Sequence, residues 1–107
     1  MTNAAYSISR SPVTVQTDVA NSETIEFEDF QYGMVYVPDG SSLTTLTWYA
    51  SLEKTGPFIA ADDAAGNAVT QTVAAGQAHP IPSALVGARF LRITGNVAGV
   101  VGVTLKT

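Results

Sequence analysis

Few residues in this sequence have types and spacing that could support catalysis. His79 is the single histidine of the 107-residue chain, and it precedes Pro80 in the stretch AHPIP, a context typical of a strand end or a turn. A catalytic triad or a zinc site would require a nucleophile or an acidic cluster beside this histidine. The sequence shows no such partner, so we assign His79 a structural role and predict no catalytic residue and no enzyme activity.

Two groups of carboxylates have the chemistry to bind a cation or to transfer protons. The stretch DDAAGN, residues 62–67, gathers hard oxygen ligands of the kind that calcium prefers. It lacks EF-hand spacing and a following bidentate glutamate, so it predicts a hairpin turn with solvated acids. Glu26, Glu28 and Asp29 form an acidic strand face, and Glu26 and Glu28 are same-face neighbours that we interpret as solvated rather than as an acid/base pair. We therefore expect no metal site and no cofactor.

Arginine and aromatic residues remain as candidates for recognition. In the stretch IPSALVGARFLRITGN, residues 81–96, Arg92 shares a strand face with Phe90, and neither face of the strand is cleanly polar. The segment YGMVYVP, residues 32–38, is apolar on both faces, with Tyr36 on one of them. A two-layer sandwich covers only one face of each sheet, so these strands need a loop, an arm or a second subunit as cover. We favour a second subunit, because aromatic residues and Arg are enriched at protein interfaces.

The predicted interface extends to a further strand and to the N-terminus. Trp48 shares its face with other apolar residues and is expected in the core, which turns the neighbouring Tyr49 outward. The predicted protein-interface residues are Tyr6, Arg10, Tyr36, Tyr49, Phe90 and Arg92.

The elements that must position these residues are short strands. Apolar residues alternate with polar ones, and β-branched and aromatic types are frequent, in residues 13–19, 24–28, 45–50, 69–73 and 101–106. Turn signals separate these stretches, among them Pro38-Asp39-Gly40, Thr55-Gly56-Pro57, Ala65-Gly66-Asn67 and Ala75-Gly76. The pattern predicts an all-β fold, an antiparallel β-sandwich or jelly roll of seven to eight short strands.

Two segments depart from this pattern. Pro82 and Gly87 bracket a single predicted helical turn over residues 82–87. Residues 1–12 are weakly patterned and are expected to form an N-terminal arm, while residues 13–107 form one sandwich domain.

Composition narrows the class of partner. The net charge is −4 and only 13% of the residues are charged, about half the usual fraction. This balance disfavours nucleic acid and anionic membranes as partners, and no apolar run reaches the ~20 residues of a membrane span. The start of the chain lacks a basic segment followed by an apolar one, so we expect no signal peptide. The absence of cysteine excludes disulfides and thiolate metal sites.

Residues 43–107 contain a series of short sequence patterns that are similar to those of a known class of protein. A WYAS strand, a GNA turn, the stretch IPSALVGARFLRI and a terminal VTLKT occur in this order. Together they resemble the capsid decoration (cement) proteins of tailed phages and related small β-sandwich modules of heads and tails. ARFLRI is also similar to a strand of discoidin-like sandwiches, but this chain is too short for that domain and lacks its cysteines. The cement-protein resemblance implies homotrimers at three-fold positions of an icosahedral shell, bound to the major capsid protein, and supplies no catalytic residue.

The sequence thus predicts a virion structural protein, made in the host cytoplasm and located on the capsid surface. It would oligomerise, as a trimer, and stabilise the phage head by binding across capsomer boundaries. The alternative is a carbohydrate-binding module that uses Tyr49 or other outward aromatic residues as a stacking platform. An oligomer favours the first hypothesis, and a monomer with glycan-responsive fluorescence favours the second.

Overall fold

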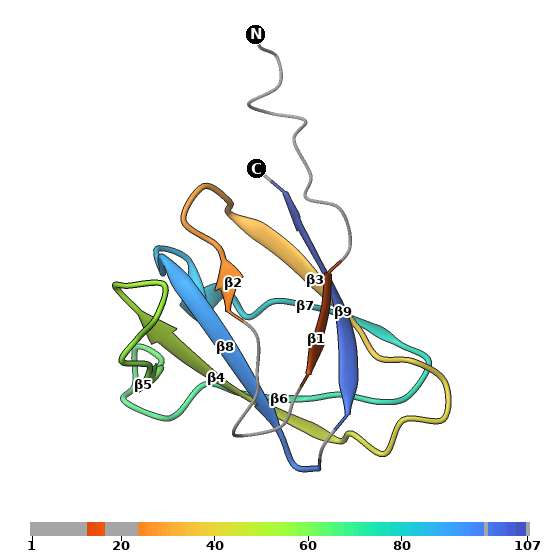
Figure 1. Cartoon of the computed structure of the whole chain (residues 1–107). Helices are drawn as coiled ribbons and strands as arrows, with labels where there is room; N and C mark the ends of the chain where they lie inside the picture. Colours follow the sequence, from red (N-terminus) through yellow and green to blue (C-terminus); the bar gives the residue numbers. More distant parts are fainter. Residues whose placement is uncertain (1–12, 17–23, 98, 107) are drawn as a thin grey trace, which may run out of the picture.

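The predicted all-β fold is confirmed. The computed structural model describes residues 13–16, 24–97 and 99–106, which form short strands and one 3-10 turn (Figure 1). In chain order the elements are β1 (Val13–Gln16), β2 (Ile25–Glu26), β3 (Tyr32–Tyr36), β4 (Thr45–Ser51), β5 (Ile59–Ala60), β6 (Thr70–Thr72), β7 (Ala78–Pro80), η1 (Ser83–Leu85), β8 (Phe90–Gly95) and β9 (Val100–Lys106). The predicted arm, residues 1–12, lies outside the described residues.

The strands form two antiparallel sheets. The first sheet has the order β1-β9-β3-β7, and the second has the order β2-β8-β4-β5, with β6 also paired to β4. β5 and β6 both pair with β4 and together occupy one strand position beside it. Two backbone hydrogen bonds of 3.1 Å link them to the middle of β4: Ala61 N–H donates to the Trp48 carbonyl, and Trp48 N–H donates to the Val69 carbonyl. Residues 62–68 loop out between them. The described residues therefore fill eight strand positions, in agreement with the seven to eight strands expected.

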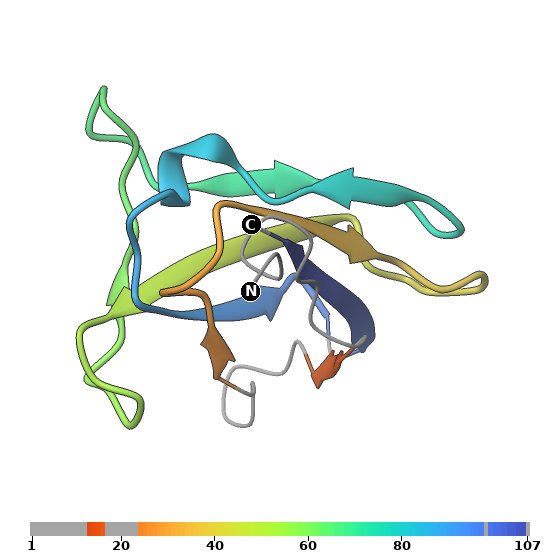
Figure 2. The same ribbon diagram turned by 90° about the horizontal axis from the view of Figure 1, so that it is seen from above.

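The order of pairing is that of a jelly roll. β1 pairs with β9, β2 with β8, β3 with β7, and β4 with β5 and β6, as if one long hairpin had been folded over on itself. The additional pairs β3–β9 and β4–β8 join the two arms of this hairpin within each sheet (Figure 2). Residues distant in sequence are thereby brought side by side, so the surfaces of the molecule are assembled from all parts of the described chain.

The core lies between the two sheets. It contains the apolar residues that alternate with polar ones along the predicted strands. Along β4, β8 and β9, buried and partly exposed residues alternate. Trp48 is fully buried, as predicted, and lies among the buried side chains of both sheets. The most deeply buried of these are Phe27, Val35, Leu43, Leu46, Leu91, Ile93, Val101, Val103 and Leu105.

The predicted helical turn is also confirmed. η1 begins directly after Pro82, and its Leu85 is buried, which fixes the turn against the core. Gly87 then takes a φ of 103°, a left-handed conformation that favours glycine and redirects the chain into β8.

Gly33 allows the closest approach of side chains to the backbone of the first sheet. A Cβ atom at this position would lie 2.5 Å from Cδ1 of Ile81 and 2.9 Å from the backbone oxygen of Thr104. Gly102 contrasts with Gly33, because a Cβ there would lie 3.7 Å from Cβ of Tyr36, an ordinary contact distance. The two glycines therefore have different roles within the same sheet.

We expect Gly33→Ala to lower the free energy of unfolding by about 1–3 kcal/mol, because the added methyl group overpacks the core. Gly102→Ala is the matched control and should be neutral or stabilising by about 0.5 kcal/mol, since Ala loses less backbone entropy than Gly. Urea unfolding followed by Trp48 fluorescence measures both. Equal effects of the two substitutions would contradict the assigned packing.

A polar bridge joins the two sheets at one edge of the core. The indole N–H of Trp48 donates to Oε1 of Gln71 at 3.2 Å, and Nε2 of Gln71 donates to the Pro80 carbonyl at 2.6 Å. Buried indole groups require such a partner, so Gln71 satisfies Trp48 and ties β6 of the second sheet to β7 of the first.

Replacement of Gln71 by Met, which has a similar shape, should lower the free energy of unfolding by about 1–3 kcal/mol, because the Trp48 N–H loses its acceptor. Gln77→Met, at an exposed position, serves as the control and should change stability by less than about 0.5 kcal/mol. Urea midpoints and the Trp48 emission maximum would show the difference. An unchanged midpoint for Gln71→Met would refute the bridge.

Candidate binding surfaces

His79 has a structural contact in the fold. His79 lies in β7, and its Nε2 accepts a hydrogen bond at 3.2 Å from the backbone N–H of Ala74, in the connection from β6 to β7. In the described part of the chain, no group of three or more acidic or histidine side chains could hold a metal ion. No helix within residues 13–16, 24–97 and 99–106 has the length and apolar character to cross a membrane.

The DDAAGN stretch forms the turn that its sequence predicts. Oδ1 of Asp63 accepts hydrogen bonds from the backbone N–H groups of Ala65 at 2.9 Å and Asn67 at 3.0 Å. These bonds close the tip of the loop between β5 and β6. The Asp63 carboxylate therefore serves the turn itself.

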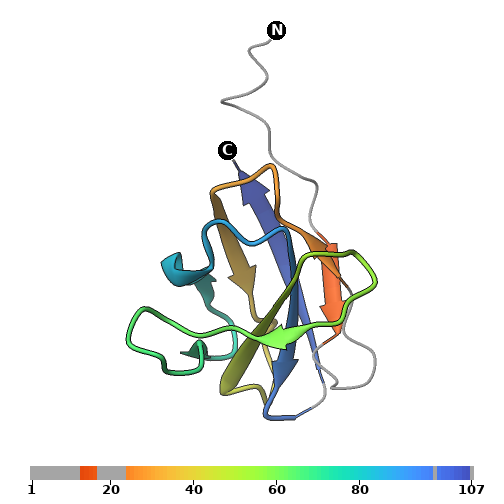
Figure 3. The same ribbon diagram turned by 90° about the vertical axis from the view of Figure 1, so that its left-hand side faces the viewer.

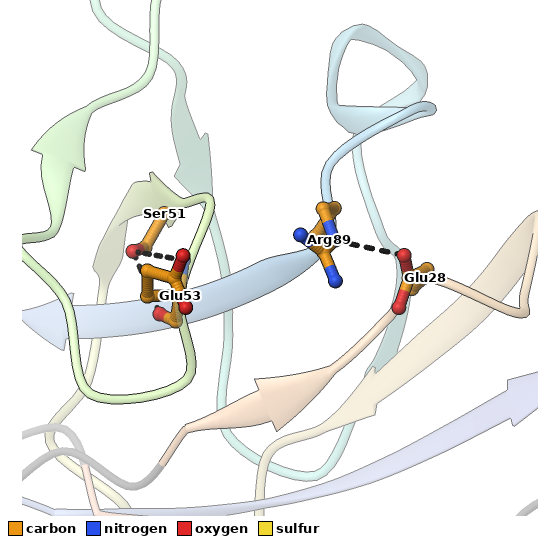
Figure 4. Close-up of polar contacts among 4 residues, drawn as sticks. All are labelled: Glu28, Ser51, Glu53 and Arg89. Atoms are coloured by element: carbon orange, nitrogen blue, oxygen red, sulfur yellow. Dashed lines mark hydrogen bonds and ion pairs between the residues drawn. The ribbon is translucent and has the colours of Figure 1, made fainter.

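The expectation that Glu26 and Glu28 are exposed to solvent is confirmed, but their placement as neighbours on one strand is wrong. β2 ends at Glu26, so Glu28 lies in the turn that follows. Glu26 pairs with Nζ of Lys54 at 3.3 Å. Oε1 of Glu28 accepts a hydrogen bond from Nε of Arg89 at 2.8 Å, as Figure 4 shows. All four side chains are about half exposed, so each pair contributes little to stability.

A loop of the chain itself covers part of the outer face of β8. Residues 52–58 leave β4 through a local turn, in which Oγ of Ser51 accepts from the backbone N–H of Glu53 at 3.0 Å and donates to its carbonyl at 2.7 Å (Figure 4). The loop then crosses β8 toward β2, where the Lys54 carbonyl accepts a hydrogen bond from Thr24 (Figure 3). The loop therefore lies over the outer face of β8, the face for which the sequence did not show what would cover it.

Phe58, at the end of this loop, lies over Arg92. Its ring centroid is 4.3 Å from Cζ of Arg92, a cation–π contact. Phe90 and Arg92 are consequently half-buried. The sequence left open whether a loop, an arm or a second subunit covers this strand, and the structure shows a loop.

The outer face of the first sheet has no such cover among the described residues. Tyr32, Tyr36 and Val100 expose 64%, 44% and 43% of their surface. Oγ1 of Thr104 donates to Oη of Tyr36 at 3.3 Å, which fixes the orientation of that ring. We call this surface the tyrosine face, made of Tyr32, Met34, Tyr36, Ala78, Pro80, Val100, Gly102 and Thr104.

The outer face of the second sheet has a different composition. In the row next to Phe90, Arg92 pairs with Tyr49, and Tyr49 pairs with Ala60. The following rows consist of threonines from β4, β6 and β8. We call this surface the threonine face, made of Thr45, Thr47, Tyr49, Ala60, Thr70, Thr72, Arg92 and Thr94.

The predicted interface residues therefore belong to two surfaces. Tyr49, Phe90 and Arg92 lie together on the outer side of the second sheet, whereas Tyr36 lies on the opposite side of the sandwich. Tyr6 and Arg10 lie outside the described residues. The sequence did not reveal Phe58, which acts from a loop, or the threonine rows, which depend on strand register.

Comparisons with known proteins identify no relative from which a function could be inferred. The sequence matches no protein-family model, no curated protein and no solved structure. The observations that carry a functional proposal are thus the jelly-roll topology and the chemistry of the tyrosine and threonine faces.

Phe58→Ala should lower the free energy of unfolding by about 1–2 kcal/mol, because it removes a half-buried ring and its contact with Arg92. Lys54→Ala, in the same loop, removes only an exposed ion pair and should cost less than about 0.5 kcal/mol. Urea unfolding compares the two variants. A larger loss for Lys54→Ala would show that the ion pair, and not the ring, holds the loop.

Proposed function

We propose that the chain is a virion structural protein, a capsid decoration subunit that associates with itself, as a trimer, and binds the major capsid protein across capsomer boundaries of a phage head. The tyrosine face carries this proposal. The resemblance in residues 43–107 supplies the class of protein, and the described surface supplies a place where a partner would bind.

The tyrosine face has the chemistry of a protein-binding surface. Its exposed tyrosines are of a residue type enriched at interfaces. None of its members is charged, and Lys106 lies at its edge, so docking removes almost no charge from water. The face lies on paired strands and is therefore preformed, which limits the entropy lost on binding.

The size of this face favours a multivalent partner. The three strands that contribute its members, β3, β7 and β9, lie about 4.8 Å apart, and over about five residues they project onto roughly 250 Å². A standard stable interface buries about 800 Å² on each partner. One face therefore supports only a weak single contact, and residues 1–12, with Tyr6 and Arg10, would add area. On a shell, repetition of a weak contact multiplies its strength through avidity.

The jelly roll is compatible with the proposal by analogy alone. This topology recurs in viral capsid proteins, and it recurs as well in lectins and other unrelated proteins. The location on the capsid surface follows from the proposed binding to the shell. Stabilisation of the head would follow by mass action, because the subunit binds the assembled lattice and not its separated parts.

The test uses the full chain and empty shells assembled from the major capsid protein encoded in the same genome. Light scattering gives the oligomeric state, and co-sedimentation gives binding to the shells. Tyr36→Ser combined with Val100→Ser should weaken shell binding about tenfold or more, because two exposed contact side chains are lost. Leu52→Ser, at a 75% exposed position outside the tyrosine face, is the control and should bind normally.

A wild-type chain that stays monomeric at high concentration and does not bind the shells would exclude the proposal. Equal binding by the double variant and the wild type would show that the tyrosine face is not the contact. Thermal unfolding of each variant establishes that the fold is retained.

A further inference from the structure

We infer that the threonine face is a binding site for an acidic glycan, with Arg92 as the ligand of a sugar carboxylate. This site lies on the sheet opposite to the tyrosine face and does not depend on the proposed decoration function. The inference rests on an unpaired guanidinium, on the free hydroxyls beside it and on the absence of exposed large apolar side chains among the members of the face.

Arg92 is a cation held in place without an anion. Its Nε is buried and has no hydrogen-bond partner, and no ion pair joins its guanidinium to any described residue. Arg89 and Lys54 are each paired with a glutamate in the same part of the molecule. In a chain of net charge −4, a half-buried arginine that has no carboxylate among the described residues is available to an external one.

The contact with Phe58 orients the guanidinium for such a ligand. The ring lies 4.3 Å from Cζ of Arg92, so it restricts the long side chain. Because Nε is buried, the two terminal Nη groups are the donors that remain for a ligand, and their fork matches the two oxygens of a carboxylate. Because the guanidinium is already held by the ring, little rotamer entropy remains to be lost on binding.

Hydroxyl groups lie in the rows next to Arg92. Thr94 follows Arg92 two residues along β8, and it pairs with Thr47, which pairs with Thr70. Adjacent strands are about 4.8 Å apart, and neighbouring rows are about 7 Å apart. None of these three hydroxyls forms a hydrogen bond within the described residues, so each is free to donate to and accept from a ligand.

The absence of apolar contacts on this face favours a sugar over an acidic protein segment. None of the eight members of this face is among the exposed large hydrophobic residues of the described chain, although Leu52, in the covering loop, and Ile59, next to Ala60, lie in neighbouring segments. Protein hot spots are built on buried apolar anchors, which this surface does not offer. A polyhydroxylated ligand with one carboxylate for each sugar matches what the face does offer, namely one cation, hydroxyl rows and the half-buried ring of Tyr49.

Calorimetric titration of the full chain tests the inference with oligogalacturonate, oligoalginate and hyaluronan oligosaccharides as probes. The matched ligand control is fully methyl-esterified oligogalacturonate, which keeps the sugar backbone and loses the charge. We expect at least one acidic probe to bind, and its affinity to fall about tenfold or more upon Arg92→Gln, because a charge-assisted bidentate contact is lost. Where oligogalacturonate is the probe that binds, esterification should weaken it to a similar extent.

Two further variants separate this site from a general charge effect. Arg89→Gln removes the same charge three residues away, at a side chain already paired with Glu28, and should leave affinity within about twofold. Thr47→Val keeps the shape and removes one hydroxyl, and it should weaken binding about threefold to tenfold. Thermal unfolding of each variant confirms that the fold is intact.

No binding of any acidic probe would overturn the inference, as would equal binding by Arg92→Gln and the wild type. Tighter, Arg92-dependent binding of a polyglutamate peptide than of every uronate would also overturn it, and would assign the face to a protein partner. Failure here leaves the tyrosine-face experiment unaffected, because Arg92→Gln and the Tyr36→Ser, Val100→Ser variant alter opposite sheets.

Discussion

The alternation of side chains along each strand is the constraint on which the rest of this structure depends. Two sheets that share one core can each hide only one face, so every second residue must tolerate water, a covering loop or a partner. The inner faces are filled by large apolar side chains around Trp48, and the Gln71 bridge satisfies the one polar group that Trp48 brings into the core. The functional question is therefore a question about the two outer faces.

The two outer faces solve this problem differently. On the second sheet, the loop of residues 52–58 covers the apolar end and leaves a surface of threonines with one stacked arginine. On the first sheet, no described segment covers Tyr32 and Tyr36, and apolar surface remains in contact with water. One face is thus suited to a polar, charged ligand and the other to a protein, and one sandwich presents both.

The expectation of a partner above β8 came from a correct interpretation of its faces, combined with the preference for a second subunit over a loop or an arm as the cover. Phe90 and Arg92 do lie on an outer face, but the cover comes from the loop of residues 52–58, whose Phe58 lies over Arg92. The ion pairs of Glu26 and Glu28 were not evident from the sequence. Their cations, Lys54 and Arg89, are distant in sequence and reach them only through the folded topology.

The sequence by itself determined the all-β class, the burial of Trp48, the turn at DDAAGN and the helical turn before Gly87, because period-two burial and turn conformations are local properties of the chain. Only the tertiary structure decided that Thr47 lies between Thr70 and Thr94, and that Phe58 lies over Arg92. Alternation specifies which side of a strand a residue occupies. The choice of the neighbouring strand is made by the packing of the whole core.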